Sequence, residues 1–439
     1  FMEANQNSII PTLYTNISMI EGYCETSGNP VPAAIAKVVK VAAMSRVTDC
    51  YGPIPYSKIG YDGNILTPYD SQQDVYYKFF EELGEAIEEL NQNRGAQLNP
   101  LIDDVYRGDV TKWIRFANSL KLRLALRISY ADPAKAKQMA EEAVNPANGG
   151  VIETVDANAT YKHYSNGGNP TYMSTVNYGN DSRPSADLIC YMNGYNDPRR
   201  AEYFTTSGWT NADGSYMTDP AGNPLEYVGV RRGWETYERD GWALKMSQIG
   251  VSSSDPTIWM TASEVAFLRA EGAAVFNWNM GGTAESFYNN GIALSFEQYG
   301  VSGAEDYMAD ATSVPATYYD PSSANPWSGS LPRVTVKWDE SASAEQKQER
   351  IIIQKWIANW TLGNEAWADL RRTGYPSLIP VAANLSGGVV DSAKGPQRMP
   401  YPQEEYTNNS TNVRNAVNTL LGGPDNMATK LWWAAKPNI

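Results

Sequence analysis

The side chains of this sequence that could do chemistry are mostly aromatic or amide-bearing, and they gather in its middle. Residues 161–183 and 203–242 place Tyr, Trp, Asn and Arg between Gly and Pro turns. Flat aromatic rings can stack on the apolar C–H faces of a neutral sugar, while Asn and Arg can hydrogen-bond to its hydroxyl groups. We therefore expect a site for a polyhydroxylated ligand here. The candidate residues are Tyr164, Asn169, Tyr172, Asn177, Tyr178, Arg183, Trp209, Tyr216, Trp234, Tyr237 and Trp242.

Each of these aromatic residues has an ordinary alternative role, which is packing inside its own loop. The chain has 28 Tyr and 13 Trp against 9 Phe. Buried cores favour Phe, Leu and Ile, whereas Tyr and Trp combine an apolar face with a polar group and suit wet binding surfaces. The composition thus favours binding but leaves open which rings contact a ligand. Trp327, in the sequence NPWSG, is a weaker candidate on another loop.

Nucleophilic, metal and redox chemistry have little support in the sequence. The only histidine is His163, and no Ser or Cys motif near it resembles a nucleophile elbow. Cys24, Cys50 and Cys190 form no CxxC pair, so we expect them to be buried. The stretch 196–198, Asn-Asp-Pro, is typical of a turn and not of a calcium loop. We expect no catalytic residue, no cofactor and no metal site.

A pair of arginines offers a different kind of site. Arg371 and Arg372 come near the end of the amphipathic sequence NEAWADLRRTGYP. Cations in the last turn of a helix complement its dipole, by about 0.3–1 kcal/mol each. Gly374 is a natural helix-ending residue, and Pro376 stops the helix. We favour a structural clasp made by these four residues, with the segment 398–402 pairing back against it, over a site for an anionic ligand.

The overall charge and hydropathy restrict the possible partners. The formal net charge of −14 argues against nucleic acid and anionic membrane surfaces, because both require basic patches. No run of about 18 apolar residues is present that could span a bilayer. The sequence starts at Phe1 without a charged or apolar leader, so we expect any export signal to have been removed or to lie outside it.

Helices must position these residues, and helical spacing of apolar residues is frequent. It predicts helices over 31–48, 71–92, 110–130, 133–145, 261–278, 284–299, 344–361 and 364–372. Ser71 is a predicted N-cap, and Thr261 with Glu264 forms a predicted capping box. Lys121, Arg123 and Arg127 interleave with an apolar stripe, and we interpret them as a solvated face in preference to a basic groove.

The predicted helices form consecutive pairs. The helices at 261–278 and 284–299 are joined by a short turn and carry Ala and Gly at their seam, as in a tetratricopeptide unit. The helix at 31–48 with that at 71–92, and the helix at 110–130 with that at 133–145, could form further pairs.

Long loops separate the helical parts. Their lack of periodicity indicates functional or disordered segments, and their aromatic residues argue against disorder. We expect a mainly α fold with few short strands. It would form one unit, in which the helical scaffold comprises 31–148, 261–300 and 344–375, the loop-rich ligand-binding part 149–256 and 301–342, and the irregular C-terminal segment 376–439.

Six short stretches together resemble one family. They are DCYGPIPYSK (49–58), EVAFLRAEGAA (264–274), QKWIA (354–358), EAWADLRRTGYP (365–376), RMPYPQEEYTNN (398–409) and KLWW (430–433). In this order they resemble the SusD/RagB family, outer-membrane lipoproteins of Bacteroidetes-type bacteria that bind nutrients at the cell surface. The resemblance runs from residue 31 to the C-terminus. The ligand-contacting residues of the family lie in comparable loops but do not align one by one, so only the region is carried over.

The resemblance implies non-catalytic binding of an oligo- or polysaccharide on a tetratricopeptide scaffold. It also implies delivery to a SusC-like, TonB-dependent β-barrel transporter, on which the binder sits as a lid. The protein would be exposed at the outer membrane, held only by an N-terminal lipid anchor that this sequence lacks. Cys24 is not that anchor, because no apolar run precedes it. The segment 22–32 looks abbreviated, which suggests that a flexible loop is missing there.

Three other functions stay open. A peptide or other non-sugar nutrient could be bound in the same lid role, at a strand edge or in a cavity closed by the barrel. A glycoside hydrolase needs two carboxylates about 5–9.5 Å apart. Such a pair could occur by chance among the 49 Asp and Glu, although no stretch suggests it. A scaffold that only holds a protein is the third alternative.

Overall fold

The computed structural model describes residues 2–60, 66–162, 164, 167–177, 182–233, 241–437 and 439, with side chains from residue 9 onward. Its main helices are α1 (Met2–Ser27), α2 (Val31–Tyr51), α3 (Gln72–Gln92), α4 (Val110–Arg127), α5 (Pro133–Ala143), α9 (Ala262–Phe276), α10 (Ala284–Gln298), α12 (Ala344–Ala358) and α13 (Gly363–Thr373). Shorter ones are α6 (Pro170–Tyr172), α7 (Ala186–Gly194), α8 (Arg200–Tyr203), α11 (Ala304–Ala309), α14 (Gln403–Asn408) and α15 (Ser410–Thr419). The predicted mainly α fold is confirmed.

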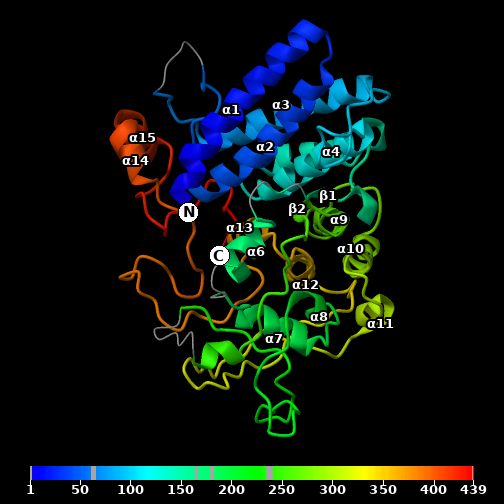
Figure 1. Ribbon diagram of the computed structural model, residues 1–439, viewed down its shortest axis with the longest axis vertical. Coiled ribbons are helices and arrows are strands. Elements are labelled where there is room, and N and C mark those ends of the chain that lie inside the picture. Colours follow the sequence, from blue (N-terminus) through cyan, green and yellow to red (C-terminus); the bar gives the residue numbers. More distant parts are fainter. Residues whose placement is uncertain are drawn as a thin grey trace.

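The helical scaffold occupies one end of the molecule, and the loops with α7 and α8 occupy the other (Figure 1). The predicted pairs α2–α3, α4–α5 and α9–α10 pack together. Ser71 Oγ accepts from the Asp74 amide at 3.1 Å and begins α3, as predicted. Small residues are needed at the α9–α10 seam, because a Cβ at Gly291 would lie 2.8 Å from the Phe267 ring.

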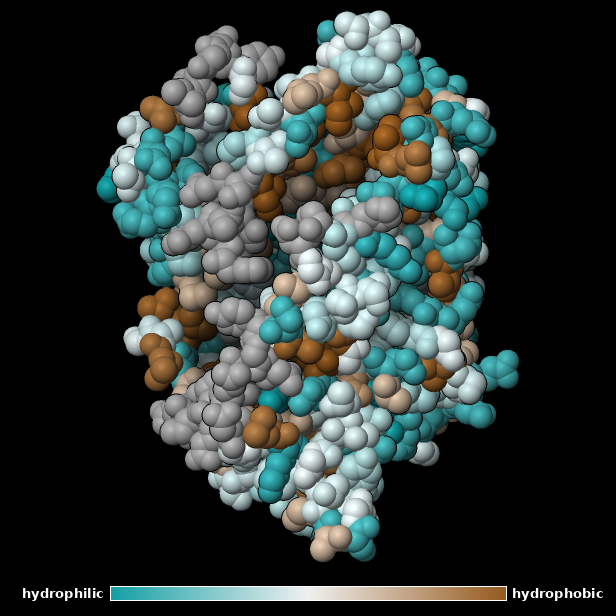
Figure 2. All heavy atoms as spheres, in the orientation of Figure 1, coloured by the Kyte–Doolittle hydropathy of each residue, from teal (hydrophilic) through white to brown (hydrophobic). Residues whose placement is uncertain are grey.

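Two strands form a short ribbon beside α4 and α9 (Figure 1). β1 (Ala159–Tyr161) pairs antiparallel with β2 (Thr257–Met260), and the register has an irregularity after Ala159. Among the described residues no helix is long and apolar enough to cross a membrane. Apolar side chains on the face shown in Figure 2 form several separate groups among hydrophilic ones.

Some helices were not predicted. The long helix α1 precedes the first predicted one and contains Pro11. It is held by packing on α2 and by a hydrogen bond from the Tyr14 hydroxyl to the Tyr56 carbonyl at 3.1 Å. The short helices α7, α8 and α11 lie in segments expected to be loops, and α14 and α15 lie in the segment expected to be irregular. Helices this short depend on tertiary contacts more than on their own periodicity.

The interpretation of Lys121, Arg123 and Arg127 as a solvated face is wrong. All three side chains are buried, and those of Arg123 and Arg127 point into a network of ion pairs at the centre of the scaffold. Arg123 donates to Glu264 at 2.8 and 2.6 Å, and Arg127 pairs with Asp49 and Glu365. Buried arginines need such partners to offset their lost hydration. The prediction that Cys24, Cys50 and Cys190 are buried is confirmed.

Candidate functional site

The first group of predicted ligand residues surrounds α6. Asn169 is buried and caps this helix, accepting from the amides of Thr171 and Tyr172 at 2.7 and 3.3 Å. Its Nδ2 donates to the Asp255 carbonyl at 3.1 Å, and the Tyr164 hydroxyl donates to the same carbonyl. These two side chains therefore hold the loop together. Tyr172 is half-buried and Asn177 is exposed.

The second group lies in the loop between α8 and β2. Trp209 is 9% exposed and packs with Leu225, Val228, Val230 and Met246, with Trp242 against them. Its Nε1 has no hydrogen-bond partner among the described residues. Arg183 donates to the Ala243 carbonyl at 2.9 Å, and Tyr216 is half-buried. Trp209 is thus part of a small satellite core here and has no open face.

The two groups are not joined into one site by the described residues. Tyr178, Trp234, Tyr237 and His163 lie outside the described residues. Trp327, the weaker candidate, is half-buried, and its indole covers Gly329, where a Cβ would lie 2.3 Å from the ring. Which of the predicted residues contact ligand therefore stays a prediction.

A groove beside α7 is lined by side chains of the types that the sequence predicts for a sugar site: aromatic, amide and guanidinium groups. Its volume is about 500 Å³, within the range of about 300–1,000 Å³ that small-molecule sites occupy. The floor is α7, one wall is the segment 219–229, and the other wall is the segment 314–319. We call this the α7 groove. Its polar and aromatic lining includes Asn193, Arg200, Asn223, Tyr227, Tyr319 and Arg333.

Two glycines allow both walls to lie against α7. A Cβ at Gly194 would lie 2.1 Å from the Val314 carbonyl oxygen, and the Ala316 amide donates to the Cys190 carbonyl at 2.8 Å. On the other side, a Cβ at Gly229 would lie 2.7 Å from the Ala186 amide nitrogen. Backbone can approach a helix this closely only where no side chain intervenes. The width of the groove therefore depends on Gly194 and Gly229.

Asn193 connects the floor to one wall. Its Oδ1 accepts from Arg200 Nη1 at 3.0 Å, and its Nδ2 donates to the Tyr227 carbonyl at 3.0 Å. The Arg200 guanidinium lies 5.3 Å from the centre of the Tyr227 ring, and its Nε donates to the Asp197 carbonyl at 2.9 Å. Burial, followed by the Glu226 charge, raises the pKa of Tyr227, so its hydroxyl stays protonated. These contacts hold the side chains of Asn193 and Arg200 in place before a ligand binds.

Tyr319 supplies the open ring of the groove. It is 39% exposed, whereas its neighbour Tyr318 is buried and donates to the Asn325 carbonyl at 3.2 Å. Arg333 is exposed, and its side chain has no hydrogen bond or ion pair with the described residues. Tyr319 and Arg333 both lie in the loop 301–342, which is predicted to belong to the ligand-binding part, but neither is among the predicted ligand residues. The tandem tyrosines in the sequence TYYD are a compositional signal for Tyr319, and Arg333 has no such signal.

The α7 groove has two acidic residues among its described lining, Asp219 and Glu226. Asp219 accepts from the amides of Ala221 and Asn223 at 2.9 and 2.8 Å, and from Asn223 Nδ2 at 2.8 Å. The Asp219 carboxylate therefore stabilises the turn in this wall of the groove.

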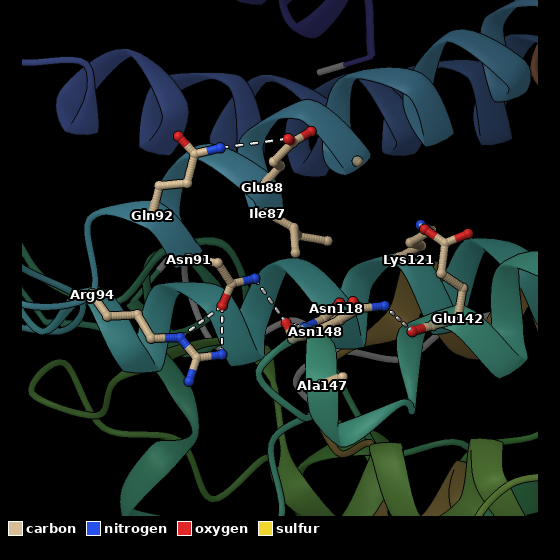
Figure 3. Close-up of a pocket in the computed structure, with 11 residues that line it drawn as sticks. Ile87, Glu88, Asn91, Gln92, Arg94, Asn118, Lys121, Glu142, Ala147 and Asn148 are labelled. Atoms are coloured by element: carbon tan, nitrogen blue, oxygen red, sulfur yellow. Dashed lines mark hydrogen bonds and ion pairs between the residues drawn. The ribbon is translucent and has the colours of Figure 1, made fainter.

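A second polar cavity, of about 550 Å³, lies on the scaffold between α3, α4 and α5 (Figure 3). Arg94 donates through Nε and Nη2 to Asn91 Oδ1 at 2.7 and 2.5 Å, and buried Lys121 donates to Glu142. Its lining contains no aromatic ring. It therefore offers no stacking surface for a sugar, and the α7 groove is the better candidate.

Arg371 and Arg372 are buried and bind to partners inside the fold. Arg372 donates through both Nη atoms to Glu271 at 2.7 and 2.8 Å. Arg371 donates to the carbonyls of Asp49 at 2.7 Å and Gln397 at 3.0 Å, and burial lowers its pKa to about 9. Gly374 ends α13 with φ 83°, and Pro376 follows it. The assignment of these four residues as a structural clasp stays a prediction. Among the described residues no three metal-ligating side chains cluster.

Comparisons with known proteins agree on one family. The family model described as SusD-like, "Susd and RagB outer membrane lipoprotein", matches residues 1–434. A SusD homolog from Bacteroides uniformis is 56% identical, with a TM-score of 0.90 over 97% of this chain and 86% of that one. A chitin-binding SusD homolog from Flavobacterium johnsoniae is 40% identical, with a TM-score of 0.86 over 98% and 87%. A comparison with curated proteins gives no match.

Proposed function

This chain belongs to the SusD-like family of outer-membrane lipoproteins, and from that premise we propose that it binds glycan at the cell surface without catalysis. The bound oligo- or polysaccharide would pass to a SusC-like, TonB-dependent β-barrel transporter. The protein would be held at the outer membrane by a lipid anchor and would cover the barrel as a lid. Supporting this, the similar protein from Flavobacterium johnsoniae is described as chitin-binding.

The observation that carries the proposal is the lining of the α7 groove. Tyr319 presents a partly exposed ring, and Arg200, Arg333 and Asn193 line the same groove with hydrogen-bonding groups. A sugar ring can place its C–H face on Tyr319 while its hydroxyls bind to these side chains. Arg333 is exposed, so this contact is available without rearrangement of the core.

Non-catalytic binding fits the same groove. Asp219, one of the two acidic residues among the described lining, is hydrogen-bonded within its own turn, which disfavours a catalytic role for it. A retaining or an inverting hydrolase requires two such groups. We therefore expect a bound oligosaccharide to be recovered intact after long incubation.

Calorimetry with defined ligands tests this proposal. Chitooligosaccharides, other neutral oligosaccharides and peptides are titrated into the protein and into Tyr319→Ala and Arg333→Ala variants. We expect one glycan to bind and each substitution to weaken binding by about 1 kcal/mol, roughly fivefold in Kd. The matched control is Tyr23→Ala, because Tyr23 is 60% exposed on α1, at the scaffold end. Peptide binding without glycan binding would contradict the proposal and favour the non-sugar alternative.

A further inference from the structure

A separate cavity lies where the loop before α4 meets the β1–β2 ribbon. Its volume is about 360 Å³, at the lower end of the range for small-molecule sites. Its apolar lining includes Tyr106, Val155 and Ile258, and its cationic lining is Arg107, Lys112 and Lys162. We call it the ribbon cavity. In Figure 1 the ribbon lies beside α4 and α9, whereas α7 lies toward the opposite end of the molecule.

The ribbon cavity carries uncompensated positive charge. Asp156 is its single acidic lining residue, and it is already paired with Lys112 at 3.2 Å. Arg107 and Lys162 are exposed, and neither side chain has an ion pair or hydrogen bond with the described residues. Two such cations on one cavity are notable in a chain of net charge −14. They create a local potential that attracts an anionic group.

Arg107 is held in a conformation that costs stability. Its φ is 56°, in the left-handed region, where a non-glycine residue loses on the order of 1 kcal/mol. The buried Asp103 fixes this loop by accepting from the Tyr106 amide at 3.0 Å, the Gly108 amide at 2.8 Å and Trp113 Nε1 at 2.8 Å. A glycine would satisfy the backbone at residue 107 without strain. The arginine therefore supplies a side chain that the fold itself does not require.

We propose that the ribbon cavity binds an acidic sugar through its carboxylate or sulfate group. Arg107 provides a planar fork of donors that matches two oxygens of such a group, and Lys162 adds a second charge. The apolar floor at Tyr106 and Ile258 can cover the face of the sugar ring. A free inorganic anion would gain nothing from that floor, which is why we assign a sugar. The assignment does not rest on the α7 groove.

Matched pairs of charged and neutral ligands test this assignment. The probes are tetragalacturonate against its methyl ester, and a sulfated galactose oligosaccharide against the same oligosaccharide without sulfate. Calorimetry is run at low and at physiological salt. We expect at least one charged probe to bind at least tenfold more tightly than its neutral partner, with the preference falling as salt rises. The carboxylate pair and the sulfate pair distinguish the two sources of charge.

Two substitutions and one control complete the test. Arg107→Gly and Lys162→Gln should each reduce the preference for the charged probe by about tenfold, and Arg107→Gly should leave the melting temperature unchanged or raise it. The control is Lys137→Gln, because Lys137 is exposed on α5 outside the cavity. Equal binding of charged and neutral probes, or a preference unchanged in Arg107→Gly, would overturn the assignment. Tyr319→Ala should leave the preference for the charged probe unchanged. The ribbon cavity can therefore be tested independently of the proposed glycan site in the α7 groove.

Discussion

At the residue scale, the most consequential side chains are the buried charges that face one another inside the scaffold. Arg372 lies fully buried between Glu271 and Asp369, with the Asp369 contact at 3.0 Å. A buried pair contributes little compared with an apolar replacement, but removal of one partner leaves an uncompensated charge. These residues therefore matter for the stability of the fold.

We expect Glu271→Gln to lower the free energy of unfolding by about 3 kcal/mol, because Arg372 loses its bidentate carboxylate partner. Urea denaturation followed by circular dichroism measures this. The matched control is Glu85→Gln, which removes an exposed pair with Lys37 and should cost less than about 1 kcal/mol. Equal losses in the free energy of unfolding for the two substitutions would contradict the larger role given to the buried pair.

The role of a single residue could be predicted where it depends on neighbours in the sequence. It could not be predicted where it depends on tertiary packing. Ser71 and Gly374 could be assigned from helix-capping preferences, because the cap is a local contact. Arg123 and Arg127 could not, because their partners Glu264 and Glu365 are more than 100 positions away. Tyr319 was missed since exposure within a loop leaves no periodic signal.

At the scale of elements, α7 organises the candidate site. It is nine residues long and lies in a segment that showed no helical periodicity. Both walls of the α7 groove pack on it through Gly194 and Gly229. The long scaffold helices and their pairing could be predicted from apolar spacing, whereas α7 is defined by chain segments far away in the sequence.

Substitution by Ala should have opposite effects on the free energy of unfolding at Gly194 and at Gly84. Gly194→Ala should lower the free energy of unfolding by about 1–3 kcal/mol and weaken glycan binding, because the new methyl group meets the backbone of Val314 and Ala316. Gly84→Ala, inside α3, meets no atom within 4 Å and should raise stability by about 0.5–1 kcal/mol. Thermal unfolding and calorimetry measure both effects. Unchanged binding in Gly194→Ala would contradict the role given to the walls.

At the scale of the whole molecule, one ion network ties the scaffold helices together. Burial alone would raise the pKa of Glu365, but Arg123 and Arg127 outweigh it and hold that pKa well below its usual range. Burial also opposes ionisation of Asp369, and Lys355 and Arg372 again lower its pKa. These carboxylates belong to α13, and their cationic partners come from α4, α12 and α13.

The network predicts a loss of stability in acid. A carboxylate whose pKa is lower in the folded state stabilises the fold above its unfolded pKa, and this contribution is lost as the pH falls through the folded value. We therefore expect the free energy of unfolding to fall steadily below about pH 5. Asp49 opposes this, because burial raises its pKa. Urea titrations between about pH 7 and pH 3 test the slope, and Asp369→Asn should make it shallower. A stability independent of pH would contradict the account.

The central claim is that the α7 groove holds glycan, and a crystal structure with a bound oligosaccharide tests it most directly. The ligand to use is the tightest oligosaccharide found by calorimetry. We predict a sugar ring over Tyr319, with hydroxyls in contact with Arg200 or Arg333. A sugar bound instead at the α6 loop, at the scaffold cavity or around Trp209, with the α7 groove empty, would contradict the claim.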